Sequence, residues 1–281
     1  MLKVILIIYS ILYTRYYILY TVLIGELISM FLFYRLLLAH IIADFPMQTS
    51  QIFKIKMNTQ WGVILHTLIV LIFSILFAFP YLENSKVLII LLVIFLSHTV
   101  IDKLKMEYSK KTKNQSMRIL LLDQFLHITI IAVLTFNFTE VYLLSSPFNS
   151  SFLNYLIDTY NSDIFIVSLI GYIASVFFIP ILLMHIREEG MPTNPKKLKK
   201  QKIINIKIPA NQTLDKFYRL FLTLSAQYLD DQYIMVIFIC FVIISYIPYR
   251  MSAERVEKAY NLKRIINSSL AIFIGIVLKM I

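Results

Sequence analysis

Charged residues and cysteines are scarce in this sequence. Charged residues make up 15% of the 281 positions, whereas a soluble domain usually carries about 25%. The one cysteine, Cys240, lies inside an apolar run, so the chain can form no internal disulfide and no thiolate metal cluster. These deficits argue against an ordinary soluble domain and against a disulfide-stabilised one.

Long apolar runs fill most of the chain instead. Hydrophobic residues account for 59% of it, and runs such as VLIILLVIFLS lie within stretches of roughly 20 residues, the length at which a helix crosses a bilayer. The runs are continuous rather than alternating, which excludes a transmembrane β-barrel. A backbone in lipid must satisfy its own hydrogen bonds, so these segments are expected to be helical. We therefore predict an all-α fold, a polytopic membrane helix bundle with about eight or nine transmembrane helices.

Nine apolar segments meet the length criterion. They are Leu2 to Leu23, Leu27 to Phe53, Trp61 to Phe79, Val87 to Leu104, Ile119 to Leu144, Ile164 to Ile186, Leu214 to Leu229, Tyr233 to Tyr249 and Ile265 to Ile281. The first lacks a small-residue cleavage site, so we interpret it as retained in the protein. The seventh carries Lys216 and Arg219, which leaves open a second interpretation, a helix lying at the membrane interface.

Basic residues gather in every second connection from residue 54 onward, and the net charge is +11. The basic connections are 54–56, 103–118, 187–207 and 250–264, and the neutral or acidic ones are 80–86, 145–163 and 229–232. Cytoplasmic loops carry the excess of lysine and arginine, so the basic connections are expected in the cytoplasm of a cell-membrane protein. This divides the chain into an N-terminal helical half (1–145), a non-cytoplasmic connection (146–163) and a C-terminal helical half (164–281).

Polar residues inside the apolar segments follow helical spacing. His40, Asp44 and Gln48 are spaced i, i+4, i+8, which places them on one face of one helix. Pro46 lies within this stretch and is expected to kink the helix between Asp44 and Gln48. The i, i+4 spacing recurs in two further pairs, His98 with Asp102 and Asp123 with His127, the latter beside Gln124.

The predicted orientation brings these residues to one depth. Together with His66, they lie near the cytoplasmic ends of four successive segments, and independent polar residues have no reason to agree in depth. An ionisable group inside a membrane helix costs about 3 kcal/mol, so such groups face the interior and have partners. Imidazole and carboxylate without thiolate form the ligand set of Zn, Mn, Fe or Mg ions.

The sequence therefore predicts a metal site for one or two divalent ions on the cytoplasmic side. Its seven candidate ligands are His40, Asp44, His66, His98, Asp102, Asp123 and His127. Gln48, Gln124 and Lys103 are predicted to surround the ions or to contact a substrate. Simpler interpretations remain: a lone histidine can be a hydrogen-bonded packing residue, and an intramembrane pair can merely neutralise itself.

Four stretches of the sequence carry a resemblance to a known family. LLAHIIADFPMQTSQIFKIK, LH at His66, SHTVIDKLK and LLDQFLHI resemble the motif blocks of domain-of-unknown-function family 3307, over residues 36 to 130. LDKFYRLFLTLSAQYL and RIINSSLAIFIGI are similar in layout to its C-terminal part. The resemblance implies an integral, multi-pass bacterial inner-membrane protein and supplies no substrate.

Three functions fit these features. The first is a metal-dependent hydrolase or transferase acting on a phosphorylated or lipid substrate, with the ions lowering the pKa of a bound water. The second is a metal-ion or proton-coupled transporter, although the outer halves of the helices look apolar. The third is a non-catalytic sensor or stress-response effector. The expected partners are the lipid bilayer and an anionic headgroup or phosphorylated small molecule, whereas NPKKLKKQK is too short to argue for nucleic acid.

Overall fold

The described part of the chain is built from helices. A computed structural model describes residues 30–112, 117–136, 138, 142–145, 150–183, 212–229 and 255–281, and every regular element in these ranges is helical. The predicted all-α fold is confirmed to that extent. The predicted segments Leu2 to Leu23 and Tyr233 to Tyr249, with Cys240, lie outside the described residues.

The helices follow one another with short connections. In chain order they are α2 (Phe31–Asp44), α3 (Ser50–Asn58), α4 (Gln60–Phe77), the 3₁₀ turn η1 (Phe79–Tyr81), α5 (Ser85–Thr112), α6 (Met117–Thr135), α7 (Ser151–Asn161), α8 (Asp163–Ile173), the π-helical turn η2 (Ala174–Phe178), α11 (Gln212–Tyr228) and α13 (Arg255–Met280).

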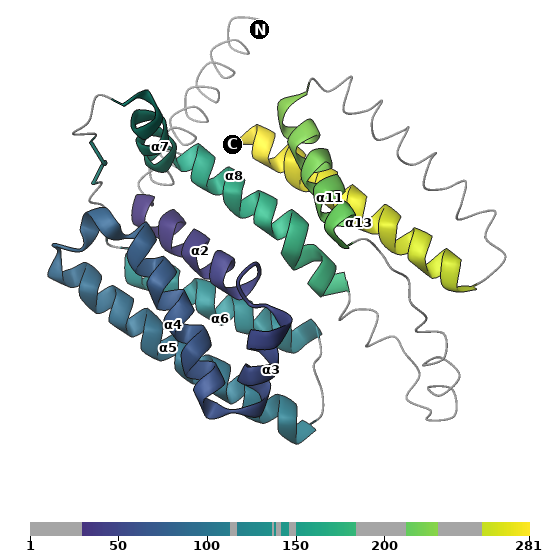
Figure 1. Cartoon of the computed structure of the whole chain (residues 1–281), viewed down its shortest axis with the longest axis horizontal. Coiled ribbons are helices and arrows are strands. Elements are labelled where there is room, and N and C mark those ends of the chain that lie inside the picture. Colours follow the sequence, from purple (N-terminus) through teal and green to yellow (C-terminus); the bar gives the residue numbers. More distant parts are fainter. Residues whose placement is uncertain are drawn as a thin grey trace, which may run out of the picture.

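Helix α2 occupies the centre of the arrangement. It packs against α4 and α6 on one side and against α8 on the other (Figure 1). Helices α4, α5 and α6 pack in chain order, α4 on α5 and α5 on α6. Beyond α8, the helices α11 and α13 pack closely on each other, and the backbone at Gly275 makes this possible because a Cβ there would lie 2.4 Å from the Thr223 carbonyl oxygen.

Helix α2 ends at Asp44. This corrects the prediction of one kinked helix that continues to Phe53. Pro46 has no N–H to donate to the carbonyl of Ile42, and the helix stops there instead of bending. The carbonyl of Ile42, which Pro46 leaves without its usual donor, accepts from the Met47 N–H at 3.1 Å. Gln48 therefore lies in a loop and not on the helical face of His40 and Asp44.

Helices α3 and α4 form a tight corner around Thr59 and Gly62. The Thr59 hydroxyl caps α4 by accepting from the Gly62 N–H at 3.0 Å, and it also donates to the Ile55 carbonyl at 3.0 Å. A Cβ on Gly62 would lie 2.3 Å from the Ile55 carbonyl and 2.4 Å from the Lys56 nitrogen. Only glycine allows α3 to approach α4 so closely, and this approach places Lys56 inside the bundle.

A π-helical turn interrupts the long helix that α8 begins. Pro180 lies just after this turn and supplies no N–H, so the carbonyl of Val176, four residues earlier, lacks its α-helical donor. Arg219 of α11 donates to that carbonyl from Nη2 at 3.2 Å. Arg219 thus supplies a donor to a carbonyl that the helix break leaves without its usual one, as a low-polarity environment requires.

Three helices in the described part are long and apolar enough to cross a membrane: Ser85–Thr112, Met117–Thr135 and Asp163–Leu183. The apolar helices Trp61–Phe77 and Ile265–Met280 are shorter, and α2 has 14 residues. The predicted count of eight or nine transmembrane helices is therefore not supported among the described residues. The coarser prediction, helices of membrane-spanning character, is supported.

Arg35 connects α2 to the start of α8. It has no exposed surface, and its Nη1 donates to the Phe31 carbonyl at 3.0 Å and to the Asp163 carboxylate. Its Nη2 donates to the Tyr160 carbonyl at 2.5 Å, and its guanidinium group lies over the Phe31 ring. This ion pair lies at the start of α2, away from His40 and Asp44 at the helix end.

Candidate metal centre

Four histidines from four helices meet inside the bundle. His40 of α2, His66 of α4, His98 of α5 and His127 of α6 are all buried. The ring centroid of His98 lies 3.9 Å from that of His127, 5.3 Å from that of His40 and 5.4 Å from that of His66. His98 is therefore the centre of the imidazole group.

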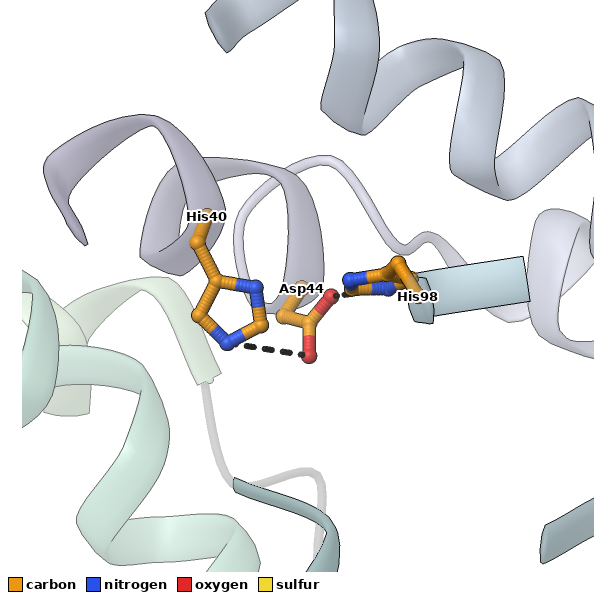
Figure 2. Close-up of side chains that lie close together, drawn as sticks. All are labelled: His40, Asp44 and His98. Carbon is orange, nitrogen blue, oxygen red and sulfur yellow. Dashed lines mark ion pairs between the residues drawn. The ribbon is translucent and has the colours of Figure 1, made fainter. Parts of the chain in front are cut away.

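Three buried aspartates lie beside the imidazoles. The Asp44 carboxylate accepts from His66 Nε2 at 3.1 Å and lies between His40 and His98 (Figure 2), with Oδ2 3.8 Å from His40 Nε2 and Oδ1 3.6 Å from His98 Nε2. Asp102 Oδ2 lies 3.4 Å from His98 Nε2 and 3.6 Å from His66 Nε2. Each of these carboxylates thus faces more than one imidazole.

Asp123 is the third carboxylate of the cluster. Its Oδ1 lies 3.8 Å from His127 Nδ1, which also lies 2.8 Å from the Asp123 carbonyl oxygen. Gln124 links this carboxylate to Asp44, because its Nε2 donates to Asp44 Oδ2 at 2.8 Å and to Asp123 Oδ2 at 3.2 Å. The amide thereby fixes the distance between two carboxylates that would otherwise repel each other.

Two lysines pair with the carboxylates. Lys56 of α3 is 3% exposed, and its Nζ lies 2.7 Å from Asp102 Oδ2. Lys105 of α5 donates to Asp123 Oδ2 at 2.6 Å, and its side chain is 22% exposed. Lysine is almost never buried unless it is paired, so these contacts explain why Lys56 tolerates its position.

Several ligand atoms of the cluster have no hydrogen-bond partner in the part of the chain that the structure describes. They include Nδ1 and Nε2 of His40, Nδ1 of His66, Nε2 of His98, Nε2 of His127 and Oδ1 of Asp123. Buried polar atoms are usually satisfied, and leaving one unpaired costs about 1–3 kcal/mol. A cation bound among them would satisfy those that carry a lone pair.

The geometry defines three overlapping groups that could hold a metal ion. These are His40–Asp44–His98, His66–His98–Asp102 and Asp44–Asp123–His127, and within each group the ligand atoms lie within 4.8 Å of one another. All seven predicted ligands occur in the three groups. Asp44 and His98 each belong to two groups, so neighbouring sites would share ligands.

The cluster is one layer in a regular stack along the four helices. One helical turn from each histidine toward the end of the bundle near Arg35 lies a buried apolar residue: Leu36, Val70, Ile94 and Ile131. One turn in the opposite direction lies a carboxylate on three helices and glycine on the fourth: Asp44, Asp102, Asp123 and Gly62. Residues four apart share a helix face, so the apolar, imidazole and carboxylate layers follow from spacing alone.

Three further polar residues were predicted near the ions, and the structure separates them. Gln124 contacts two carboxylates, as described above. Gln48 lies in the loop after α2, and its side chain donates to the Asp44 carbonyl at 3.4 Å. Lys103 is exposed on α5, and the lysine that reaches the cluster is Lys105.

Sequence reasoning missed two of the buried charges. Lys56 was assigned only to a short basic connection, because its approach to Asp102 depends on the corner between α3 and α4. Arg35 left a signal that could have been used: an arginine inside an apolar segment, five residues before His40, is expected to have a buried partner.

The fold and the cluster together define a class: in its described part, a helical protein with three helices long and apolar enough to cross a membrane, and with a buried His/Asp cluster on the four helices α2, α4, α5 and α6. Residues 32–157 match the model of the family described as "Protein of unknown function (DUF3307)". This confirms the resemblance to that family, and the four motif blocks at residues 36–130 lie inside the matched range, whereas the C-terminal stretches lie outside it. No curated protein and no solved structure matches the chain.

Proposed function

We propose that the protein is a multi-pass bacterial inner-membrane metalloenzyme, a hydrolase or transferase that acts on a phosphorylated or lipid substrate. One observation carries this proposal. Four helices bring four imidazoles and three carboxylates into contact, and all seven side chains are buried. Seven ligands exceed the needs of one tetrahedral ion and suit two divalent ions, between which the Asp44 carboxylate could be shared.

The chemistry of the ligand set supports a reaction at a phosphoryl or acyl centre. Ions held by these residues would polarise a substrate oxygen and would lower the pKa of a bound water. For a phosphomonoester, the water oxygen bonds to phosphorus and the ester P–O bond breaks. One water proton ends on the released alcohol and the other stays on the phosphate.

The apolar layer beside the imidazoles favours an enzyme over a transporter. Leu36, Ile94 and Ile131 belong to one hydrophobic core cluster with Phe31, Tyr81 and Ile90. A transport path needs polar groups through the full thickness of the membrane. Arg35 and Asp163 contradict a wholly apolar outer half, but Arg35 is closed off by three oxygen acceptors and an aromatic ring, which suits a structural role.

The proposed cytoplasmic placement of the cluster is supported by the distribution of basic residues. The exposed lysines nearest to the cluster in sequence, Lys54 and Lys103, lie on the carboxylate side of the stack. Positive charge marks the cytoplasmic face, so the carboxylate layer is proposed to face the inner headgroups. A substrate with its tail in lipid and its head in water would meet the ions there.

The proposal is tested by metal analysis of purified full-length protein. Wild type is expected to carry stoichiometric divalent metal after mild purification, and to release inorganic phosphate from phosphomonoester lipids in a metal-dependent manner. His98→Ala, which removes a ligand from two groups, is expected to lose metal and activity. His185→Ala, which changes the one histidine outside the seven predicted ligands, is the control. A wild-type protein that takes up no metal would refute the metal centre.

A further inference from the structure

Two lysines lie on the carboxylate side of the cluster, and an ammonium group cannot itself ligate a metal ion. Lys56 pairs with Asp102, and Lys105 pairs with Asp123. Each ammonium has three N–H donors, and each has one carboxylate acceptor within the described residues. Both lysines therefore keep unused donors beside carboxylates that the proposed ions would share.

The charge of the cluster determines which ligand it accepts. Asp44, Asp102 and Asp123 supply three negative charges and the two lysines supply two positive ones, so the cluster carries one net negative charge when its histidines are neutral. One divalent ion would change this to one net positive charge, and two ions would change it to three. A buried excess of charge is costly unless it is paired, so the metal-loaded site requires an anionic ligand.

The position of the lysines sets where that anion would bind. Lys56 enters the carboxylate layer at the helix where Gly62 stands in place of a fourth aspartate. Lys105, at 22% exposure, is the most exposed charged side chain of the cluster. The apolar layer lies on the opposite side of the imidazoles. The partly exposed Lys105 therefore marks the side from which an anion would approach the cluster.

We propose that Lys56 and Lys105 bind the oxygens of a phosphate group beside the metal ions, which makes them the residues that select a phosphorylated substrate. This inference rests on the metal centre proposed above and adds the substrate class. A tetrahedral phosphate dianion offers enough negative oxygens to contact both ammonium groups and the ions. The phosphate could belong to a lipid headgroup or to a soluble compound, since both present the same chemistry.

The test uses the full-length protein in phosphatidylcholine nanodiscs, with Mn²⁺ as the metal and inorganic phosphate as the probe. Broadening of the phosphate signal in phosphorus NMR reports phosphate held next to Mn²⁺, and wild type is expected to produce it. Lys56→Gln and Lys105→Gln are each expected to weaken phosphate binding about ten- to hundredfold, with Mn²⁺ stoichiometry unchanged. Lys54→Gln and Lys103→Gln change exposed lysines on the same two helices and are expected to bind phosphate like wild type.

The outcomes are separable. Unchanged phosphate affinity in both the Lys56 and Lys105 variants, or an equal loss in the two control variants, would overturn the assignment while leaving the metal centre intact. Absence of Mn²⁺ binding in wild type would overturn both proposals. Lys105 is partly exposed, so Lys105→Gln is expected to fold even if Lys56→Gln is destabilised. Lys56→Arg keeps the positive charge and is expected to bind phosphate more tightly than Lys56→Gln.

Added phosphatidic acid distinguishes the two sources of phosphate. If the natural ligand is a lipid headgroup, nanodiscs that contain phosphatidic acid are expected to suppress the binding of inorganic phosphate. If it is a soluble compound, inorganic phosphate binds equally in both kinds of nanodisc. In either case the dependence on Lys56 and Lys105 is expected to remain, and its loss in both would refute the proposal.

Discussion

The backbone of Ile55 lies against Gly62 with no room for a side chain between them, because a Cβ on Gly62 would come within 2.3 Å of the Ile55 carbonyl carbon and oxygen. This contact joins a nine-residue helix to the bundle and delivers Lys56 to Asp102 at 2.7 Å. The position of one buried charge thus depends on the absence of one methyl group.

Gly62→Ala is expected to displace α3 and to lower the free energy of unfolding by about 1–3 kcal/mol, the usual cost of overpacking. Thermal unfolding in detergent measures this. Gly171→Ala is the control: its Cβ would meet the Leu278 side chain at 2.7 Å, and a side chain can move where backbone cannot. Equal destabilisation by the two variants would contradict the backbone contact.

Asp163→Asn is expected to destabilise the protein more than Arg35→Met. The first change leaves a fully buried guanidinium without its carboxylate, at a cost of about 3–5 kcal/mol, whereas the second leaves a carboxylate that is 21% exposed. The double variant is expected to recover part of the loss, because neither charge is then unpaired. A double-mutant cycle on unfolding free energies measures the coupling, and additive losses would count against the ion pair.

A membrane-impermeant amine reagent is expected to distinguish lysines by side and by burial. Lys54 and Lys103 are exposed, Lys105 is partly exposed and Lys56 is buried, so labelling in inside-out vesicles should be fast, slow and undetectable in that order. Lys86, exposed at the other end of α5, should react only from the outer side. Mass spectrometry of the labelled peptides reads this out, and labelling of Lys86 and Lys103 from the same side would refute the orientation.

Addition of Mn²⁺ is expected to stabilise wild type against thermal unfolding. At a free metal concentration of a hundred times Kd the gain is about 2.7 kcal/mol, and a chelator should reverse it. The gain should fall as the pH is lowered, since a protonated imidazole cannot ligate a metal ion. His98→Ala should show no gain at any pH, and an undiminished gain in that variant would place the metal elsewhere.

The convergence of the histidines and aspartates could be predicted because it depends on two regular quantities. Helical spacing of four puts His98 and Asp102 on one face, and the alternation of basic connections gives the direction of each segment. The spacing is kept in the structure even though α2 is shorter than expected, and the direction of the segments relative to the membrane stays a prediction. The end of α2 at Asp44 was less accessible, because Pro46 permits either a kink or a stop and the surrounding packing decides between them.

Lys56 could not be placed from sequence for a related reason. It belongs to a helix that has no transmembrane character, so nothing in its spacing connects it to the aspartates. Its burial results from a corner whose closeness is encoded by Gly62, and a glycine in an apolar segment has several possible explanations. That Lys105 and not Lys103 faces the cluster was predictable in principle. Lys105 lies three residues after Asp102, on the same face of α5, whereas Lys103 lies only one residue after it.

The ion pair between Arg35 and Asp163 limits where the protein can be truncated. Arg35 belongs to the portion that matches the family, and Asp163 lies just past its final matched residue. Expressed alone, that portion would lack both the carboxylate that pairs with Arg35 and the helix α8 that packs against α2, so it is expected to be unstable. Helix α2, which carries His40 and Asp44, is held in place by its contacts with α8. The matched portion is therefore expected to fold only when the C-terminal half is expressed with it.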